Sequence, residues 1–305
     1  MVATELISVR SPRKSLDQLS REARILVDAY GFAHYDRLRI RKDETLEDET
    51  LDIGEIQSHL KDAPIGHRVI YFSEVTSTMD VANQEALGGS EEGVVVLAEE
   101  QTAGRGRFGR NWISAAGKNL SFSVVLYPNS WASARIAIAA TVAVVRAIRQ
   151  ITGLEPSVKW PNDVLLDGKK VAGILVETTF QSNAVRHAIL GIGINVNLDP
   201  SAKLDQGYAA TCLASELGKW VSRHDILEVV LEELGMVYAE LKGWAYTWEE
   251  WQAAMETLGR SVRVRWGDQL EQGIAQRVDS VGNLVVQRAD GSMVTLSAGD
   301  VTFQS

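Results

Sequence analysis

Hydrophobic residues recur with the spacing of strands and of helices through the middle of the chain. Short runs rich in β-branched and aromatic residues predict strands. These runs lie at residues 68–72, 93–98, 120–127, 157–160, 164–166, 171–177 and 188–196. Apolar residues at helical spacing, bounded by capping residues and glycines, predict helices at 52–60, 76–88, 136–151 and 222–241. The Asp167-Gly168 turn joins two of the strands in a hairpin, so we predict a mixed sheet flanked by helices, in the α+β class.

The pattern changes near residue 258. Four short β-rich runs follow, at 261–266, 269–278, 284–288 and 293–296. The residue pairs between them are typical of turns, and they are Gly267-Asp268, Gly282-Asn283 and Asp290-Gly291. Short strands at this spacing indicate a small all-β module. We therefore place a domain boundary between residues 257 and 258.

The first 60 residues follow neither pattern. Residues 15–30 have apolar positions at helical spacing behind a capping box, which predicts one short helix. Residues 37–52 run from basic to strongly acidic, as solvated segments do. A DNA-reading helix-turn-helix needs two or three helices with an apolar face. We predict that residues 1–60 form an extension, partly helical with a charged linker, without a DNA-binding domain.

Composition is that of an ordinary globular protein. The 305 residues are 45% hydrophobic and 23% charged, which allows a sizeable core. The net charge of −9 and a pI near 5.2 argue against DNA as a partner held by general electrostatics. The single cysteine, Cys212, is consistent with a reducing compartment. No signal peptide is visible, and the apolar helix at 136–145 is too short to span a membrane, so we expect a soluble, cytoplasmic protein with no membrane partner.

Cationic side chains are concentrated between residues 97 and 112, where the sequence reads LAEEQTAGRGRFGRNW. Arg105, Arg107 and Arg110 lie among glycines, which let a backbone fold closely round a ligand whose anionic oxygens the arginines can bind. The stretch also satisfies G-x-G-x-x-G. A dinucleotide-binding fingerprint needs a helix at its last glycine, but a loop and a β-rich run follow here. We predict a site for an anionic small molecule; a surface loop without a ligand is the alternative.

Three further clusters carry polar groups at the ends of predicted strands. Lys159 to Asp163 (KWPND) could line the mouth of a sheet or form an ordinary Asn-Asp turn. Lys170 opens an apolar strand, where a lysine is more often an edge residue than a ligand. Residues 191–197 (GIGINVN) place two glycines in a β-branched strand, as either a close approach of a flat ligand or a core strand would require. Ser77 and Thr78 could be helix caps or ligand contacts.

Taken in order, these clusters resemble the biotin protein ligase family. The matching segments are TSTMD, AEEQTAGRGRFGRNW, KWPNDV, KKVAGILVE and GIGINVN, and the resemblance covers about residues 65 to 305. It implies a class II synthetase-like catalytic domain that binds biotin and ATP, at residues 61–257, followed by an SH3-like β-barrel at 258–305. It implies a reaction in two steps. Biotin and ATP form biotinyl-5′-AMP, and a lysine of a biotin carboxyl carrier protein then accepts the biotinyl group.

The resemblance also implies roles for particular residues. The implied catalytic residues are Arg107, Lys170 and Asp163. The implied biotin contacts are Ser77, Thr78, Gln101, Arg105, Gly106, Arg107, Lys170 and Gly173. The implied ATP and adenylate contacts are Arg107, Arg110, Trp112, Asn162, Lys170 and Asn195. No cluster of carboxylates predicts a metal site in the protein itself, so Mg²⁺ is expected to arrive with the nucleotide.

Two departures from the family pattern bear on function. Met79 stands where many members have asparagine, which leaves only apolar or backbone contacts to biotin at that position. Residues 1–60 do not resemble the winged helix-turn-helix of members that also repress transcription. The alternatives to a biotin protein ligase are a repressor that senses biotinyl-adenylate and a lipoate-type ligase. A homodimer is compatible with the sequence, and we expect the arginine loop to be mobile without ligand and to order over the adenylate.

Overall fold

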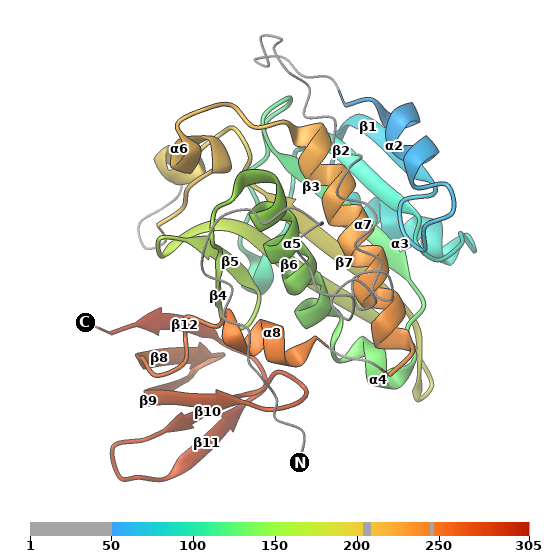
Figure 1. Ribbon diagram of the computed structural model, residues 1–305. Coiled ribbons are helices and arrows are strands. Elements are labelled where there is room, and N and C mark those ends of the chain that lie inside the picture. The colour runs from blue at the N-terminus through green and yellow to red at the C-terminus, as the bar shows by residue number, and fades with distance from the viewer. Residues whose placement is uncertain (1–50, 204–208, 245–246, 305) are drawn as a thin grey trace, which may run out of the picture. The chain divides into compact units, whose positions relative to one another are not determined.

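The structure is a computed structural model, and it describes residues 51–203, 209–244 and 247–304 (Figure 1). The helix predicted at 15–30 and nearly all of the charged linker lie outside the described residues. The predicted helix at 52–60 is confirmed as α2 (Ile53–His59), with Asp52 accepting a hydrogen bond from the Glu55 backbone N–H. Leu51 and Ile56 are buried in the same hydrophobic core as the central sheet. The boundary at residue 60 stays a prediction.

A seven-stranded mixed sheet forms the centre of the protein (Figure 1). Its strands are β1 (Val69–Val75), β2 (Val95–Gln101), β3 (Leu120–Leu126), β4 (Ser157–Lys159), β5 (Asp163–Leu166), β6 (Lys169–Gln181) and β7 (Ala184–Ile194). Their order is β1-β2-β3-β7-β6-β5-β4, with β1 and β2 parallel and every other pair antiparallel. The predicted hairpin is confirmed at β5 and β6, where Asp167 and Gly168 have φ values of 48° and 73°. Positive φ at both positions is what a tight two-residue hairpin needs.

Helices cover both faces of this sheet. α5 (Ile136–Thr152) and α7 (Arg223–Lys242) lie side by side over one face, and α3 (Thr78–Leu87) packs on the other (Figure 1). The shorter helices are α4 (Ser130–Ser133), α6 (Leu213–Leu217) and α8 (Trp248–Ala253). Gly153 ends α5 in the left-handed region, and Ser222 caps α7 by accepting the Asp225 N–H, as the sequence predicts.

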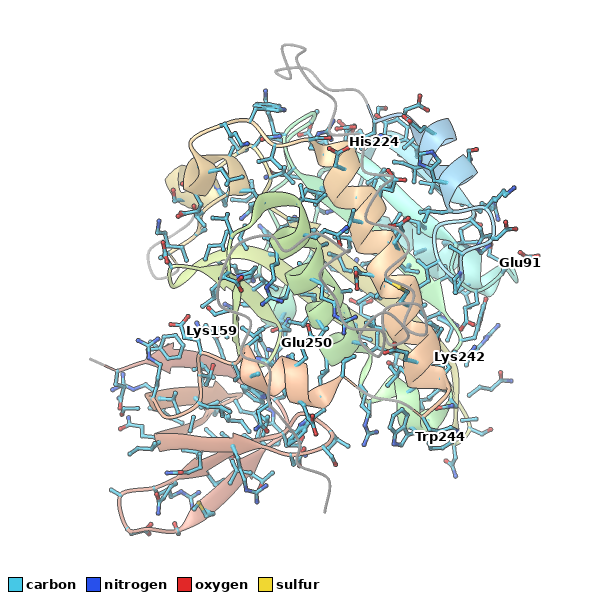
Figure 2. The ribbon with its side chains drawn as sticks, in the orientation of Figure 1. Glu91, Lys159, His224, Lys242, Trp244 and Glu250 are labelled. Carbon is cyan, nitrogen blue, oxygen red and sulfur yellow. The ribbon has the colours of Figure 1, made fainter. Side chains whose placement is uncertain are left out.

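One arginine ties three of these helices together. Arg146, on α5, pairs with Glu233 of α7 at 3.2 Å and with Glu250 of α8 at 2.7 Å. Figure 2 labels Glu250 on α8, the short helix that precedes the C-terminal strands. Among the described residues, no helix combines the length and the apolar character needed to cross a membrane.

The two faces of the sheet differ because side chains alternate along each strand. On β3, Leu120, Phe122 and Val124 face the core beneath α5 and α7, whereas Ser121 and Ser123 are buried on the opposite face. On β7, Leu190, Ile192 and Ile194 belong to that core, and Gly191 and Gly193 alternate with them. The sequence thus builds one apolar face and one face of serines and glycines. The second face has room for a ligand.

The C-terminal module is a five-stranded antiparallel sheet. Its strands are β8 (Ser261–Trp266), β9 (Gln269–Val278), β10 (Leu284–Gln287), β11 (Met293–Leu296) and β12 (Asp300–Phe303), in the order β11-β10-β9-β8-β12. The four predicted strands are confirmed. The sequence interpretation missed β12. That strand pairs with β8 and reaches the site described next.

Candidate active site

A cavity of about 410 Å³ opens on the serine and glycine face of the central sheet. This volume is suited to a small organic ligand. Its walls come from the start of α3, the loop after β2, the turn from β4 into β5, the first half of β6, the end of β7 and the start of β12. All of the predicted site residues line it: Ser77, Thr78, Gln101, Arg105, Gly106, Arg107, Arg110, Trp112, Asn162, Asp163, Lys170, Gly173 and Asn195. The fold brings together residues that are separated by up to 118 positions in sequence, from 77 to 195.

One end of the cavity is polar and uncharged. Gln101 Oε1 accepts hydrogen bonds from the Thr78 backbone N–H at 2.8 Å and from Thr78 Oγ1 at 3.1 Å. Ser77 occupies the cap position of α3, but its hydroxyl makes no capping hydrogen bond. Ser77 Oγ is buried and has no hydrogen-bond partner among the described residues. A buried hydroxyl without a partner costs about 1–3 kcal/mol, so a ligand that satisfies it is favoured.

Three strand glycines form the floor of the cavity. The Trp112 indole lies on Gly193, where an added Cβ would be 2.2 Å from the ring, and Trp112 Nε1 donates to Ser121 Oγ at 3.2 Å. The Met79 thioether lies on Gly191, where a Cβ would be 2.9 Å from Sδ. At Gly173, a Cβ would be 3.0 Å from Lys170 Nζ. Any larger residue at these positions would displace a side chain that shapes the cavity.

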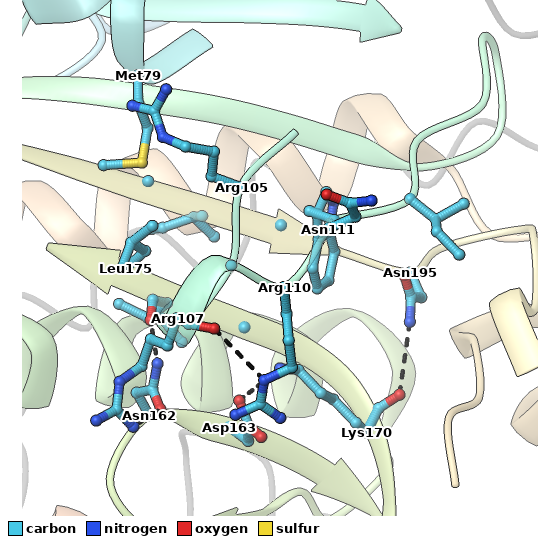
Figure 3. A pocket seen from close by; sticks show the side chains of 18 of the residues that line it. Met79, Arg105, Arg107, Arg110, Asn111, Asn162, Asp163, Lys170, Leu175 and Asn195 are labelled. Carbon is cyan, nitrogen blue, oxygen red and sulfur yellow. Dashed lines mark hydrogen bonds and ion pairs between the residues drawn. The ribbon is translucent and has the colours of Figure 1, made fainter. Parts of the chain in front are cut away.

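The other end of the cavity carries a lysine held by a strand. Lys170 Nζ pairs with Asp163 Oδ1 at 2.6 Å, across the β5–β6 hairpin (Figure 3). The Lys170 backbone is hydrogen-bonded to the segment before α6. Its N–H donates to Ala209 O at 2.8 Å, and its carbonyl accepts from Thr211 N at 2.9 Å. Lys170 is therefore a cavity residue and not a surface edge lysine. One carboxylate neutralises its amine.

The arginine loop is held by the segment before β5 and by residues at the start of β12. Arg107 Nη1 donates to Asn162 Oδ1 and to the carbonyl oxygen of Gly299, each at 3.2 Å. Arg110 Nη2 pairs with Asp300 Oδ1 at 3.2 Å. Phe108 separates the two arginines and has a φ of 56°, which is uncommon for a bulky residue. The loop contains a 3₁₀ turn at Arg107–Gly109 and no α-helix, so the dinucleotide-binding alternative is excluded.

Arg105 lies at the rim, close to Met79 (Figure 3). Its guanidinium pairs with Asp80 at 2.6 Å and with Glu177 at 3.4 Å. The hydrogen bond to Asp80 raises the pKa of Arg105 above its ordinary value, so it stays charged. Arg105 thus has two carboxylate partners, against one for Lys170, so it is the weaker candidate for binding an anion.

The two asparagines of the site are already engaged by the protein. Asn162 Nδ2 donates to Ile174 O, and its Oδ1 accepts from Arg107. Asn195 Nδ2 donates to Thr211 O at 3.0 Å and to Lys170 O at 3.5 Å. Both side chains thus orient neighbouring site residues. Their contacts with a nucleotide stay predictions.

Sequence reasoning missed the contribution of β12. Asp300 lines the cavity, and Gly299 supplies a carbonyl to Arg107. Burial lowers the pKa of Lys159, whose amine lies 5.7 Å from the ring centre of Phe303 at the end of the same strand. The short run DVTF carries alternating residues that could have indicated a fifth strand. Nothing in that run indicates where the strand lies relative to the arginine loop.

Comparisons with known proteins agree with this site. The Biotin/lipoate A/B protein ligase family matches residues 69–195, and the Biotin protein ligase C terminal domain matches residues 257–303. The biotin acetyl-CoA-carboxylase ligase of Paracoccus denitrificans is 34% identical over 235 residues, which are 73% of this chain and 97% of that protein. The chain belongs to the biotin protein ligase family. The first family match contains every predicted site residue, since these lie between Ser77 and Asn195.

Two further biotin protein ligase relatives extend the comparison. The bifunctional ligase/repressor BirA of Bacillus subtilis is 32% identical over 253 residues, 81% of this chain and 78% of that protein. The solved structure of the Aquifex aeolicus biotin protein ligase in complex with biotin and ATP has a TM-score of 0.65 and 27% identity, covering 78% of this chain and 98% of that one. The α+β fold class with a C-terminal antiparallel module is therefore confirmed.

Proposed function

We propose that this protein is a biotin protein ligase. It uses ATP to convert biotin to biotinyl-5′-AMP, and then transfers the biotinyl group to a lysine of a biotin carboxyl carrier protein. The observation that carries the proposal is the division of one cavity into a neutral polar end and a cationic end. A ligand with a polar ring and an anionic tail matches this division. A nucleoside phosphate beside the cationic end completes the pair of reactants.

The polar end suits the ureido ring of biotin. Ser77 Oγ can donate to or accept from the ring, because no described residue occupies it. Thr78 and Gln101 are hydrogen-bonded to each other and line the same cavity as Ser77. Met79 closes this end with an apolar thioether over Gly191. The ring is bound by polar groups on one side and by apolar contact on the other.

The first step joins two anions. An oxygen of the biotin carboxylate attacks the α-phosphorus of ATP, the bond from that phosphorus to the bridging oxygen breaks, and pyrophosphate leaves. Lys170 and Arg107 hold the carboxylate and the α-phosphate together and offset the negative charge as it builds up. Asp163 binds Lys170 until the anions arrive. Trp112, lying flat on Gly193, covers the adenylate.

The second step transfers the biotinyl group. The neutral amine of the acceptor lysine attacks the carbonyl carbon of the mixed anhydride, and AMP leaves with the pair of electrons of the broken bond. The attacking nitrogen loses a proton. Asp163 lies at the cationic end of the cavity, and once Lys170 has turned to the phosphate, its carboxylate can accept that proton.

Magnesium accompanies the nucleotide in this proposal. Among the described residues, no group of three His, Cys, Asp or Glu side chains is arranged to hold a metal ion. The cavity carboxylates, Asp163 and Asp300, are each paired with a cation of the protein. A metal ion bound to the phosphates supplies additional positive charge, while Lys170 and Arg107 orient the reacting oxygens.

A direct assay tests the function. The protein is incubated with ATP, magnesium, biotin and a purified carrier domain, and the mass of the carrier is measured. We expect a mass increase equal to one biotinyl group. An unmodified carrier, together with no biotinyl-adenylate, would contradict the proposal. Lipoate in place of biotin tests the lipoate-type alternative, and modification with lipoate alone would favour it.

A repressor function needs a separate test. The Bacillus subtilis relative is named a bifunctional ligase/repressor, and the segment in which a DNA-reading element would lie is outside the described residues. Filter binding of double-stranded DNA at several salt concentrations measures DNA binding with and without biotinyl-adenylate. We expect weak binding that is lost at moderate salt. Light scattering of the same samples measures whether the protein forms a homodimer.

A further inference from the structure

The C-terminal sheet has one face that no described residue covers. Along β8, Val262 and Val264 are buried, whereas Arg263 and Arg265 are exposed. Their pairing partners on β9, Gln272 and Leu270, are exposed as well. Directly paired residues of antiparallel strands point to the same side of the sheet. We call this surface, formed by Arg263, Arg265, Leu270, Gln272, Asp300 and Thr302, the outer face.

The outer face is continuous with the mouth of the cavity. Asp300 of β12 is paired with Arg265, and Arg265 is paired with Leu270. Asp300 also lines the cavity and binds Arg110 at 3.2 Å. Because neighbouring strands lie about 4.8 Å apart, Arg265 is one strand from the cavity wall and Leu270 is two. A protein resting on the outer face therefore lies beside the reacting groups.

The two arginines of this face are not paired within the described part of the chain. Arg263 and Arg265 have no ion pair or side-chain hydrogen bond to a described residue. Arg288 of the same module, by contrast, pairs with Glu271 at 2.7 Å. Leu270, which is 47% exposed, is paired with Arg265 on this face. Arginine beside large apolar side chains is the composition that protein interfaces favour.

We propose that the outer face docks the acceptor carrier domain, through acidic side chains that flank its target lysine. This rests on the proposed function, since the second step requires a folded partner to bring a lysine to the cavity. Unpaired arginines at the rim select a partner of opposite charge and steer its approach. Arg263 and Arg265 do not touch the reacting atoms. They increase the affinity for the carrier and leave adenylate formation to the cavity.

Charge reversal tests the proposal. Arg263→Glu, Arg265→Glu and the double variant are compared with wild type in two assays. The first measures biotinyl-adenylate formation without carrier, and the second measures KM and kcat for the carrier. We expect the double variant to raise the KM for the carrier by about tenfold or more, because each rim charge contributes to binding, with adenylate formation unchanged. Arg186→Glu is the matched control, since Arg186 is exposed on β7 outside the cavity and the outer face.

A carrier of altered charge provides the second test. In this carrier, the acidic residues next to the acceptor lysine are changed to lysine. We expect wild type to biotinylate it poorly and the Arg263→Glu, Arg265→Glu variant to biotinylate it better than wild type does. The milder Arg263→Gln, Arg265→Gln variant should show a weaker salt dependence of the carrier KM than wild type.

Several results would overturn the docking surface. An unchanged carrier KM in the double variant would show that the outer face does not bind the carrier. Loss of adenylate formation in the double variant would show that the two arginines act in the cavity and not in docking. A lower carrier KM indicates that the outer face binds an acidic segment of the same chain, such as residues 43–49, and not the carrier. A wild-type protein that forms no biotinyl-adenylate contradicts the proposed function itself, and the two failures are thereby distinguished.

Discussion

The cavity has two cationic regions that are built in different ways. Lys170 is on β6, and hydrogen bonds of its own backbone to residues 209 and 211 hold it at the sheet. Arg107 and Arg110 are on a loop, and side-chain contacts to Asn162, Gly299 and Asp300 hold them. The sheet thus supplies a preorganised cation. The loop supplies cations whose positions depend on a second module.

This difference separates two requirements of the reaction. A cation that offsets charge at the reacting centre must be in place before the chemistry begins. Groups that enclose the substrate must also let it enter and leave. A strand meets the first requirement because many backbone hydrogen bonds fix it. A glycine-rich loop meets the second because a few long contacts can break and form again. We therefore expect substitutions at Lys170 to affect rate, and substitutions in the loop to affect retention.

The largest effect is expected for Lys170→Ala. Removal of a charge-stabilising group from an active site lowers the rate by about 10²- to 10³-fold, and we expect this loss in biotinyl-adenylate formation. Lys169→Ala is the matched control, since the neighbouring Lys169 pairs with Glu216 outside the cavity. Pyrophosphate release measures the rate. Because the Lys170–Asp163 pair is partly screened by solvent, the thermal midpoint should change by only a few degrees. Adenylate formation at the wild-type rate in Lys170→Ala would contradict the proposed catalytic role of Lys170.

Arg107→Ala is expected to weaken binding more than rate. The variant loses the donors that we propose bind the adenylate, so we expect biotin affinity to fall and the adenylate to dissociate about 10- to 100-fold faster. Retention of radiolabelled adenylate through gel filtration measures this loss. Arg149→Ala is the control, because Arg149 makes an exposed pair with Glu155. If Arg107→Ala slowed adenylate formation as much as Lys170→Ala and left retention unchanged, the comparison between loop and strand would be wrong.

Gly193→Ala tests the floor that both regions share. Its Cβ would be 2.2 Å from the Trp112 ring, so the indole has to move off the strand. We expect about tenfold weaker ATP binding, from the loss of ring contact with the adenine. Gly235→Ala is the control, since Gly235 is within helix α7 and its added Cβ would meet no atom closer than 3.5 Å. The intrinsic tryptophan fluorescence, to which Trp112 contributes, should change in the first variant only. Wild-type ATP affinity in Gly193→Ala would show that Trp112 does not contact the nucleotide.

The smallest effect is expected for Asp300→Asn. The variant keeps a hydrogen-bond acceptor for Arg110 and loses the opposite charge, in a pair that is partly exposed. We expect adenylate retention to fall by about threefold, a size typical of such pairs. Asp290→Asn, in an exposed turn of the same module, is the control. Equal retention in both variants would show that the loop does not depend on β12.

Much of the fold follows from patterns within single segments. The alternation in LSFSVVL and AILGIGI predicts two strands, and the structure confirms each with one apolar face. Gly153 and Ser222 predict helix ends correctly because capping involves only neighbouring residues. Ser77 shows where local reasoning fails. It lies at the cap position, but its hydroxyl makes no capping hydrogen bond and has no partner among the described residues.

The amino-acid sequence by itself determined most of the strands and helices, most residues of the cavity and the family, because these depend on spacing along the chain and on side-chain chemistry. Only the tertiary structure decided that Arg105 is neutralised by Asp80 and Glu177, that Asn195 is bonded to backbone, and that Asp300 completes the site. Each of these depends on the distance between atoms of different elements. Distances of that kind are set by how the sheets and helices pack, and no local pattern in the chain encodes them.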